Sequence, residues 1–337
     1  MSQAIENQTD VEIIDRLREA RTLLKDEIAK VIIGQDEVVD KVLIALFCQG
    51  HSLMIGVPGL AKTLLVKTIA QILDLDFGRI QFTPDLMPSD IIGTEIIEEN
   101  LETGRRQFRF IKGPVFHNII LADEINRTPP KTQAALLEAM EEHRVTAGGE
   151  EFQLEEPFFV LATQNPIEQE GTYPLPEAQL DRFMFNIPLD YPSNQDEEEI
   201  VKRTTAVQDT KLNKVLDAEQ VIDIQNVVRK IPVSDQMVSY AVKLVARTRP
   251  MDPQSPEFVR NWVRWGASVR ASQYLILGAK ARSVIRGNYA VAPEDISYIA
   301  REVLGHRLVT NFQAESEGVA ANDIVTRLLE ETDVPPG

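Results

Sequence analysis

Short runs of consecutive apolar residues alternate with longer amphipathic stretches through the first 190 residues of the chain. An unbroken apolar run is typical of a strand buried on both faces of a parallel sheet, whereas apolar spacing of three and four residues is typical of a helix. The runs predict five strands, at Ser52–Ile55, Arg79–Phe82, Ile119–Ala122, Phe158–Thr163 and Phe183–Leu189. Helical patterns at 5–30, 36–47, 61–73 and 132–142 precede or separate them. We therefore expect an α/β fold with a five-stranded parallel sheet and right-handed crossovers.

The pattern changes after residue 190. Tyr191–Gln195 has the composition of a linker, and almost every later apolar pattern has helical spacing. The expected helices cover 196–207, 218–230, 234–247, 257–286 and 293–311. We therefore expect two domains, an α/β domain over residues 1–190 and a smaller, all-helical domain over residues 196–330.

Two stretches of alternating residues interrupt the expected sheet and predict hairpin insertions near 94–112 and 144–156. The first has a glycine-bearing turn at 100–104, and the second turns at Gly148-Gly149. Such hairpins are either decoration or surfaces that contact a partner, and the pattern leaves both open.

Composition excludes several classes of protein. The chain has 337 residues, is 43% hydrophobic, and has one cysteine, Cys48, which rules out an internal disulfide. Its four histidines are scattered without metal-ligand spacing. The longest apolar run, Val42–Cys48, is far shorter than the roughly 20 residues that a membrane span needs. The first 30 residues are charged and helix-like, unlike a signal peptide, so we expect a cytoplasmic protein without a membrane span.

Charge is unevenly distributed along the chain. Residues 1–190 contain 17 Lys and Arg against 32 Asp and Glu, a net charge of −15, whereas residues 191–337 contain 18 against 20. The overall charge of −17 opposes non-specific binding to nucleic acid. The stretch Lys243–Arg307 nevertheless has 11 basic and 5 acidic residues. It is either a nucleic-acid patch or a surface that faces bound nucleotide or the acidic half of a neighbouring copy, and we favour the second interpretation.

A glycine-containing loop follows the first expected strand and opens a helical pattern. Its residues are Gly56, Val57, Pro58, Gly59, Leu60, Ala61, Lys62 and Thr63, with Leu64 next in the helix. Backbone N–H groups of such a loop and of the following helical turn form an anion site. Lys62 is expected to reach the β- and γ-phosphates and Thr63 to bind Mg²⁺. Ala61 stands where the usual pattern has its second glycine, so the turn must tolerate a methyl group.

Two acids, Asp123 and Glu124, end the buried strand at Ile119–Ala122. An acid at the end of such a strand lies beside the phosphate loop, where it can hold Mg²⁺. A second acid next to it can act as a general base toward the attacking water. We therefore expect Asp123 to be a metal ligand and Glu124 to be the catalytic base.

Three further polar residues are candidates for the same reaction. Asn165, at the end of the strand before Pro166, can orient the attacking water, or it simply forms a turn before the proline. Arg182 precedes the last strand and suits the nucleotide of a neighbouring subunit, as an arginine finger. The alternatives for Arg182 are an ion pair near Asp181 or a cation at a helix C-terminus. Arg270, at the start of a long helix, can close over the γ-phosphate of its own subunit.

Taken together, these motifs resemble those of the MoxR-type AAA+ ATPases of the helix-2-insert clade. The resemblance covers roughly residues 25–325 and rests on Gly34-Gln35, the phosphate loop, Asp123–Arg127, the Gln133–Val145 stretch, Ala162–Pro166, Gly171–Phe183 and Ser268–Ala271. It implies a P-loop AAA+ core followed by a helical lid domain. It also implies that Asn165 is sensor 1, Arg182 the finger and Arg270 sensor 2, with Gly34 and Gln35 near the adenine. Val269 stands where family members often have proline.

The resemblance implies Mg²⁺-dependent hydrolysis of ATP in a ring, usually a hexamer, that drives chaperone-like remodelling of a client protein. The client is often one with a von Willebrand A domain. We expect a homo-oligomer and no nucleic acid.

Two alternatives stay open. A nucleic-acid-stimulated motor or loader would use Lys243–Arg307 and bind with a steep salt dependence. A switch that binds ATP without hydrolysing it needs no base, and Glu124 argues against it.

Overall fold

A computed structural model describes residues 8–99, 106–167, 171–206 and 210–335. Five parallel strands form its central sheet in the order β2-β5-β8-β1-β9. Their bounds are β1 His51–Ile55, β2 Phe77–Gln81, β5 Ile119–Asp123, β8 Phe159–Gln164 and β9 Phe183–Pro188. The five-stranded parallel sheet expected from the apolar runs is confirmed.

Alternate residues of the strands pack into two separate apolar clusters, one on each face of the sheet. Ile119 and Leu121 join the cluster of α1 Gln8–Ala29, α2 Asp36–Phe47 and α3 Lys62–Ile72. Ile120 and Ala122 join the cluster of α5 Pro130–Glu142. Burial on both faces explains why the strands read as unbroken apolar runs rather than as alternating patterns.

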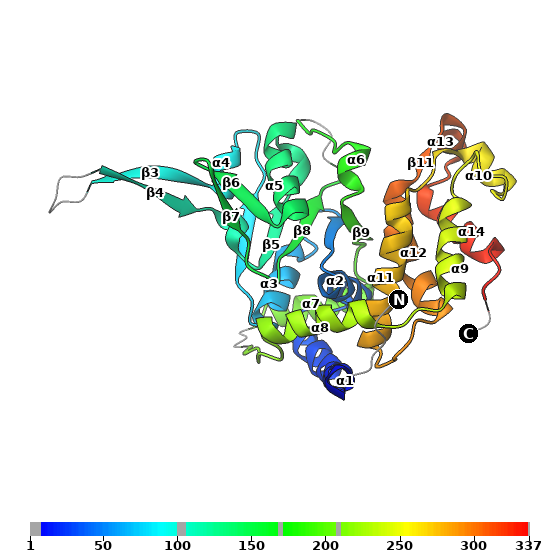
Figure 1. Cartoon of the computed structure of the whole chain (residues 1–337), viewed down its shortest axis with the longest axis horizontal. Helices are drawn as coiled ribbons and strands as arrows, with labels where there is room; N and C mark the ends of the chain where they lie inside the picture. Colours follow the sequence, from blue (N-terminus) through cyan, green and yellow to red (C-terminus); the bar gives the residue numbers. More distant parts are fainter. Residues whose placement is uncertain (1–7, 100–105, 168–170, 207–209, 336–337) are drawn as a thin grey trace.

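The chain after the sheet is mainly helical, and Figure 1 shows most of its helices grouped beyond the β9 edge of the sheet. Their bounds are α7 Asn194–Thr204, α8 Ala218–Lys230, α9 Asp235–Ala246, α10 Glu257–Trp262, α11 Val269–Ile285, α12 Pro293–Leu304, α13 Phe312–Glu317 and α14 Ala321–Glu331. Helix α8 packs against α1 and α2 as well as against α11, and one apolar cluster continues from α1 into α14. The domain limits 1–190 and 196–330 therefore stay a prediction.

The helical lid domain is confirmed and contains one short pair of strands, but the single helix expected over 257–286 is wrong. The chain leaves the helix at β10 Val263–Trp265, which pairs antiparallel with β11 Val309–Thr310, and a new helix starts at Val269. At Gly266 an added Cβ atom would lie 2.4 Å from the carbonyl oxygen of Thr248. Close approach of the Thr248 backbone therefore requires glycine at this position, between the extended segment and the new helix.

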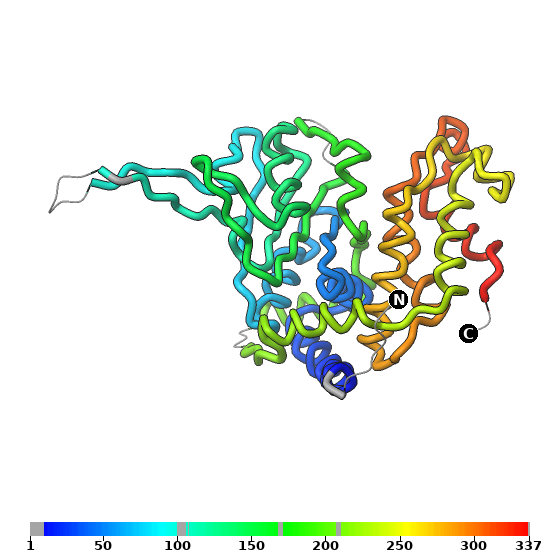
Figure 2. Tube along the Cα trace, viewed as in Figure 1, coloured from blue at the N-terminus to red at the C-terminus, as the bar shows by residue number. Residues whose placement is uncertain are grey.

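Both expected hairpins are confirmed. They are β3 Gly93–Glu99 with β4 Arg106–Lys112, and β6 Arg144–Ala147 with β7 Glu150–Gln153. Phe110 stacks on Phe152 with ring centroids 4.5 Å apart, which joins the base of the first hairpin to the second. The strands of the β3–β4 hairpin extend away from the body (Figures 1 and 2), and its turn at 100–104 lies outside the described residues.

Over the described ranges, no helix combines the length and the apolar character that crossing a membrane requires.

Candidate nucleotide site

The loop between β1 and α3 has the backbone of an anion site. Helix α3 begins at Lys62, and Gly59 has a φ of +88° in open space. Ala61 is the N-cap, with a φ of +56° and a ψ of +22°. This left-handed conformation explains why glycine is usual at that position, and the methyl group is tolerated because Ala61 is exposed.

Lys62 points back across this loop. Its Nζ atom donates a hydrogen bond to the carbonyl oxygen of Gly56 at 2.5 Å. Partial burial lowers the pKa of Lys62, and the nearby charges of Asp123 and Glu124 oppose that shift. The ammonium group is thus held between the loop and the two acids.

The acids at the end of β5 are positioned by a residue that sequence reasoning missed. The hydroxyl of Thr163, on β8, donates to Asp123 Oδ1 at 2.7 Å and accepts from the backbone N–H of Glu124 at 2.9 Å. Glu124 itself has a left-handed backbone, with a φ of +58° and a ψ of +49°. The turn after β5 is therefore pinned by the neighbouring strand.

Side chains at the end of β2 also contact these acids, and they too were missed. Arg79 donates to Asp123 Oδ2 at 2.6 Å, and Gln81 donates to Glu124 Oε2 at 3.2 Å. Arg127 forms an ion pair with the same Glu124 oxygen at 2.9 Å. The polar residues at alternate positions of β2 could have indicated these contacts from the sequence. Strand β2 lies beside β5, with Gln81 opposite Asp123.

Most of the expected site residues meet in one cavity of about 420 Å³. It is lined by Pro58, Gly59, Leu60, Ala61, Lys62, Thr63, Leu64, Asp123, Glu124 and Asn165. We call this the phosphate cavity. Gly56 and Val57 do not line it: Gly56 supplies the carbonyl for Lys62, and Val57 packs against the main apolar cluster.

Asn165 lies between the two key strands, because β8 separates β5 from β1. Its Oδ1 atom accepts a hydrogen bond from the backbone N–H of Ile167 at 3.2 Å, which is the turn contact weighed as its alternative role. The same side chain lines the phosphate cavity, so the turn holds the amide where it faces the acids.

A second cavity, of about 540 Å³, contains Gly34 and Gln35 together with the segment 188–193. Gln35 Nε2 donates to the carbonyl oxygen of Leu60 at 3.3 Å, so this cavity adjoins the phosphate loop. Within the described part of the chain, no donor meets the buried Oε1 atom of Gln35.

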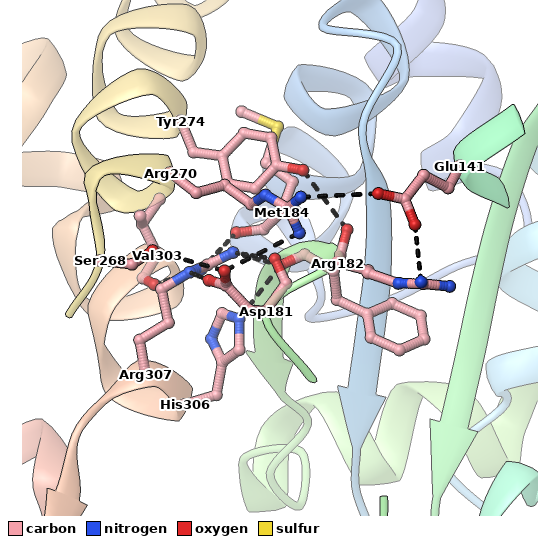
Figure 3. A network of polar contacts seen from close by, with 11 residues as sticks. Glu141, Asp181, Arg182, Met184, Ser268, Arg270, Tyr274, Val303, His306 and Arg307 are labelled. Atoms are coloured by element: carbon pink, nitrogen blue, oxygen red, sulfur yellow. Dashed lines mark hydrogen bonds and ion pairs between the residues drawn. The ribbon is translucent and has the colours of Figure 1, made fainter. Parts of the chain in front are cut away.

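Arg182 and Arg270 do not line the phosphate cavity of their own chain. Arg182 donates to the carbonyl oxygen of Leu137 at 2.9 Å and pairs with Glu141 at 2.6 Å. Arg270 approaches the same Glu141 at 3.7 Å and Asp181 at 3.8 Å (Figure 3). The ion pair weighed as an alternative for Arg182 is present, but with Glu141, at the C-terminal end of α5. The structure places Arg270 outside the phosphate cavity of its own chain, and its expected place over the γ-phosphate stays a prediction.

The residues present fit a magnesium nucleotide. Exposed loop backbone and a lysine suit a polyphosphate, and the Thr63 hydroxyl with the Asp123 carboxylate supplies the hard oxygen ligands that Mg²⁺ prefers. The unpaired oxygen of Gln35 offers an acceptor for an amino group such as that of adenine. The phosphate loop follows the first strand of a five-stranded parallel sheet, the acids end the third strand along the chain, and a polar residue lies between them. Together with the helical lid, this arrangement defines an AAA+ domain.

Comparison with known proteins agrees with this class. Residues 51–185 match the ATPase family associated with various cellular activities (AAA), and residues 257–328 match the AAA lid domain. The chain is 43% identical to Chaperone MoxR1 of Mycobacterium tuberculosis, over 92% of this chain and 81% of that protein. It is 31% identical to Protein MoxR of Methylorubrum extorquens, over 86% and 88% of the two chains. A crystal structure from Cytophaga hutchinsonii superposes with a TM-score of 0.89 at 43% identity, covering 96% of this chain and 98% of that one. The chain belongs to the MoxR family of AAA+ ATPases.

Proposed function

We propose that this protein hydrolyses ATP to ADP and phosphate in a Mg²⁺-dependent reaction. The observation that supports this most directly is the phosphate cavity, in which Asp123 and Glu124 face Lys62 and Thr63. A general base within reach of a phosphate loop is what hydrolysis requires and mere binding does not.

Each residue then has a role. Lys62 neutralises phosphate charge, and Thr63 and Asp123 hold Mg²⁺, which when bound would offset the negative charge of the phosphate oxygens. Glu124 accepts a proton from the attacking water, and Asn165 orients that water. The cavity with Gly34 and Gln35 receives the base.

We further propose that the active form is a ring of identical chains, a hexamer, in which Arg182 completes the site of the neighbouring copy. Its position outside the phosphate cavity of its own chain supports a role across an interface. Specific activity should therefore rise with protein concentration. Equal specific activity in dilute monomer and in assembled protein would contradict this part of the proposal.

The work done by hydrolysis is proposed to be chaperone-like remodelling of a partner protein. This rests on the relative named Chaperone MoxR1 and on the resemblance to MoxR-type ATPases, which extends the proposal to a client with a von Willebrand A domain. A cytoplasmic location and the lack of a nucleic-acid partner stay predictions.

The test compares Glu124→Gln with the parent protein and with Glu138→Gln, which removes an exposed acid from α5. Glu124→Gln should bind ATP with unchanged affinity and lose about 100-fold or more in turnover, whereas Glu138→Gln should behave as the parent. A pull-down with the ATP-bound Glu124→Gln protein should retain the client.

Two outcomes would replace the proposal. Equal, near-zero turnover of the parent and Glu124→Gln proteins would favour a switch that binds ATP without hydrolysing it. Stimulation of the ATPase by DNA or RNA at physiological salt would favour a nucleic-acid motor.

A further inference from the structure

One carboxylate lies between two arginines that come from different parts of the fold. Glu141, in the last turn of α5, pairs with Arg182 through Oε2 at 2.6 Å and with Arg270 through Oε1 at 3.7 Å (Figure 3). Arg182 immediately precedes β9, whereas Arg270 lies in the first turn of α11. Glu141 is thus the meeting point of the sheet region and the helical region.

Other contacts restrict where the two arginines can point. Arg182 also donates to the carbonyl oxygen of Leu137, one turn before Glu141, and its own carbonyl accepts from the Tyr274 hydroxyl at 3.4 Å. Arg270 has a second partner in Asp181 at 3.8 Å. The two side chains remain 32% and 38% exposed, so a molecule from outside the chain can reach them.

The ion pairs of Glu141 contribute little to the stability of the fold. Its side chain is 42% exposed, and exposed ion pairs contribute about 0–1 kcal/mol. Its main effect is on the orientation of the two arginine side chains, because two guanidinium groups repel each other unless an anion lies between them. Glu141 therefore sets the spacing and orientation of two cations at one surface.

We propose that Glu141 is a positioning residue that presents Arg182 and Arg270 as one pair to the polyphosphate held by a second copy of this chain. Both arginines lie outside the phosphate cavity of their own chain, and both line a single cavity of about 190 Å³ together with Glu141. A triphosphate can replace Glu141 as their common anion. The inference rests on the proposed function, because it requires ATP to be cleaved between copies.

The experiment uses full-length variants in steady-state ATPase assays. Glu141→Ala should bind ATP within about twofold of the parent and keep its KM, while kcat falls about tenfold or more, because the displaced arginines no longer reach their target. The matched control is Glu142→Gln, the adjacent acid, which pairs with Arg144 instead. It should retain parental kcat.

Mixing separates positioning from a local structural role. Glu141→Ala keeps a complete phosphate cavity, and Glu124→Gln keeps complete arginines. An equal mixture of these two weak proteins should therefore exceed the sum of their separate activities, because some interfaces combine the intact halves. A mixture of Arg182→Ala with Glu124→Gln is the positive control for such a gain. If Glu141→Ala folds poorly, the near-isosteric Glu141→Gln takes its place in the same mixture and should also show the gain.

The outcomes are distinguishable. A parent protein without ATPase activity overturns the proposed function and this inference together. An active parent with Glu141→Ala as fast as Glu142→Gln overturns the inference alone. So does a gain from the Arg182→Ala mixture without one from the Glu141 variants. The lack of any gain from mixing overturns the inference together with the proposed role of Arg182 across an interface.

Discussion

Thr163 donates its hydroxyl hydrogen to the carboxylate of Asp123 over 2.7 Å, from the strand next to the one that ends in that acid. The same hydroxyl accepts the backbone N–H of Glu124, and the Thr163 side chain is fully buried. A single side chain therefore fixes both the expected metal ligand and the turn that carries the expected base.

Replacing Thr163 by valine keeps its shape and removes both hydrogen bonds. We expect Thr163→Val to lose about 1–3 kcal/mol in the free energy of unfolding, because a buried N–H and a carboxylate oxygen lose a partner. The kcat for ATP should fall as the acids lose their fixed positions. Urea unfolding and steady-state kinetics measure the two effects. Thr163→Ser, which retains the hydroxyl, is the control, and equal losses in both variants would contradict this account.

Ala61 offers a test of backbone strain in the phosphate loop. A left-handed conformation costs a non-glycine residue roughly 1–2 kcal/mol, while a glycine loses about 0.4–1 kcal/mol through the greater freedom of the unfolded chain. Ala61→Gly should therefore raise the free energy of unfolding by roughly 0–1.6 kcal/mol and leave ATP affinity intact. Ala61→Val should lower both, because a β-branched residue rarely adopts positive φ. Thermal melting and nucleotide titration measure these effects, and a destabilised Ala61→Gly would disprove the strain.

Arg307 is a buried cation with an unusual number of partners. Its side chain is 2% exposed and donates to Asp181 Oδ1 and to the Phe183 carbonyl oxygen, each at 2.7 Å, as well as to the Met184 and Val303 carbonyls. Removing it takes one donor from each of these acceptors.

We expect Arg307→Ala to lose about 2–5 kcal/mol in the free energy of unfolding, because it removes a large buried side chain together with its hydrogen bonds. Arg301→Ala, in the preceding helix α12, should lose less than about 1 kcal/mol, since Arg301 is exposed and bonds only the Thr326 hydroxyl among the contacts described for it. Urea unfolding of both variants makes the comparison, and similar losses would refute a special role for Arg307.

His51 should make the stability of the fold depend on pH. Burial lowers the pKa of His51 to about 4, although its hydrogen bond to the Met140 carbonyl opposes the shift. Its Nδ1 atom accepts the Val160 N–H, so the folded protein holds the neutral ring. Because the folded protein lowers the pKa of His51, the contribution of its neutral ring to stability is complete above the unfolded pKa of about 6.5. That contribution is lost as the pH falls toward 4.

Protonation of His51 should lower the free energy of unfolding by roughly 3 kcal/mol as the pH falls from about 6.5 to about 4. Urea unfolding of the parent at pH 7.5, 6, 5 and 4 measures it, and His51→Gln should show a correspondingly flatter dependence. The neighbouring pair of His143 and Glu156 stays in both proteins, and its charges act on the pKa of His51 in opposite directions. Parallel pH profiles would show that His51 does not titrate in this range.

Local patterns predicted the elements that depend mainly on neighbouring residues. Helix α2 runs from Asp36 to Phe47 as its apolar spacing indicated, and the acids follow β5 as the end of the apolar run indicated. Gly148 and Gly149 both have positive φ, which is why that pair marks the turn of the β6–β7 hairpin. Where the residues that fix a structure are close in sequence, the pattern is sufficient.

Features fixed by distant residues were missed. The apolar spacing of Phe258, Val259 and Trp262 continues like a helix, but the next residue, Val263, pairs with Thr310 and becomes extended. Nothing near Arg307 in the sequence marks it as an anchor, because its carboxylate partner lies 126 positions earlier.

The same limit applies to the candidate site. Thr163 reads as one more residue of a buried strand, and its role depends on the register that places β8 beside β5. Arg182 and Arg270 were recognised individually, but their common partner Glu141 is apparent only from the fold, which brings the end of α5 within reach of both.

Because Arg307 belongs to the helical region and its acceptors include the first residues of β9, the last strand and the lid share a fixed attachment inside the protein. Pulling the two apart would leave the Arg307 guanidinium and several carbonyl oxygens without their partners inside the protein, so separating the helical region from β9 is costly. The attachment includes Asp181, one residue before Arg182, so the anchor that ties the two regions together also fixes the backbone from which Arg182 projects.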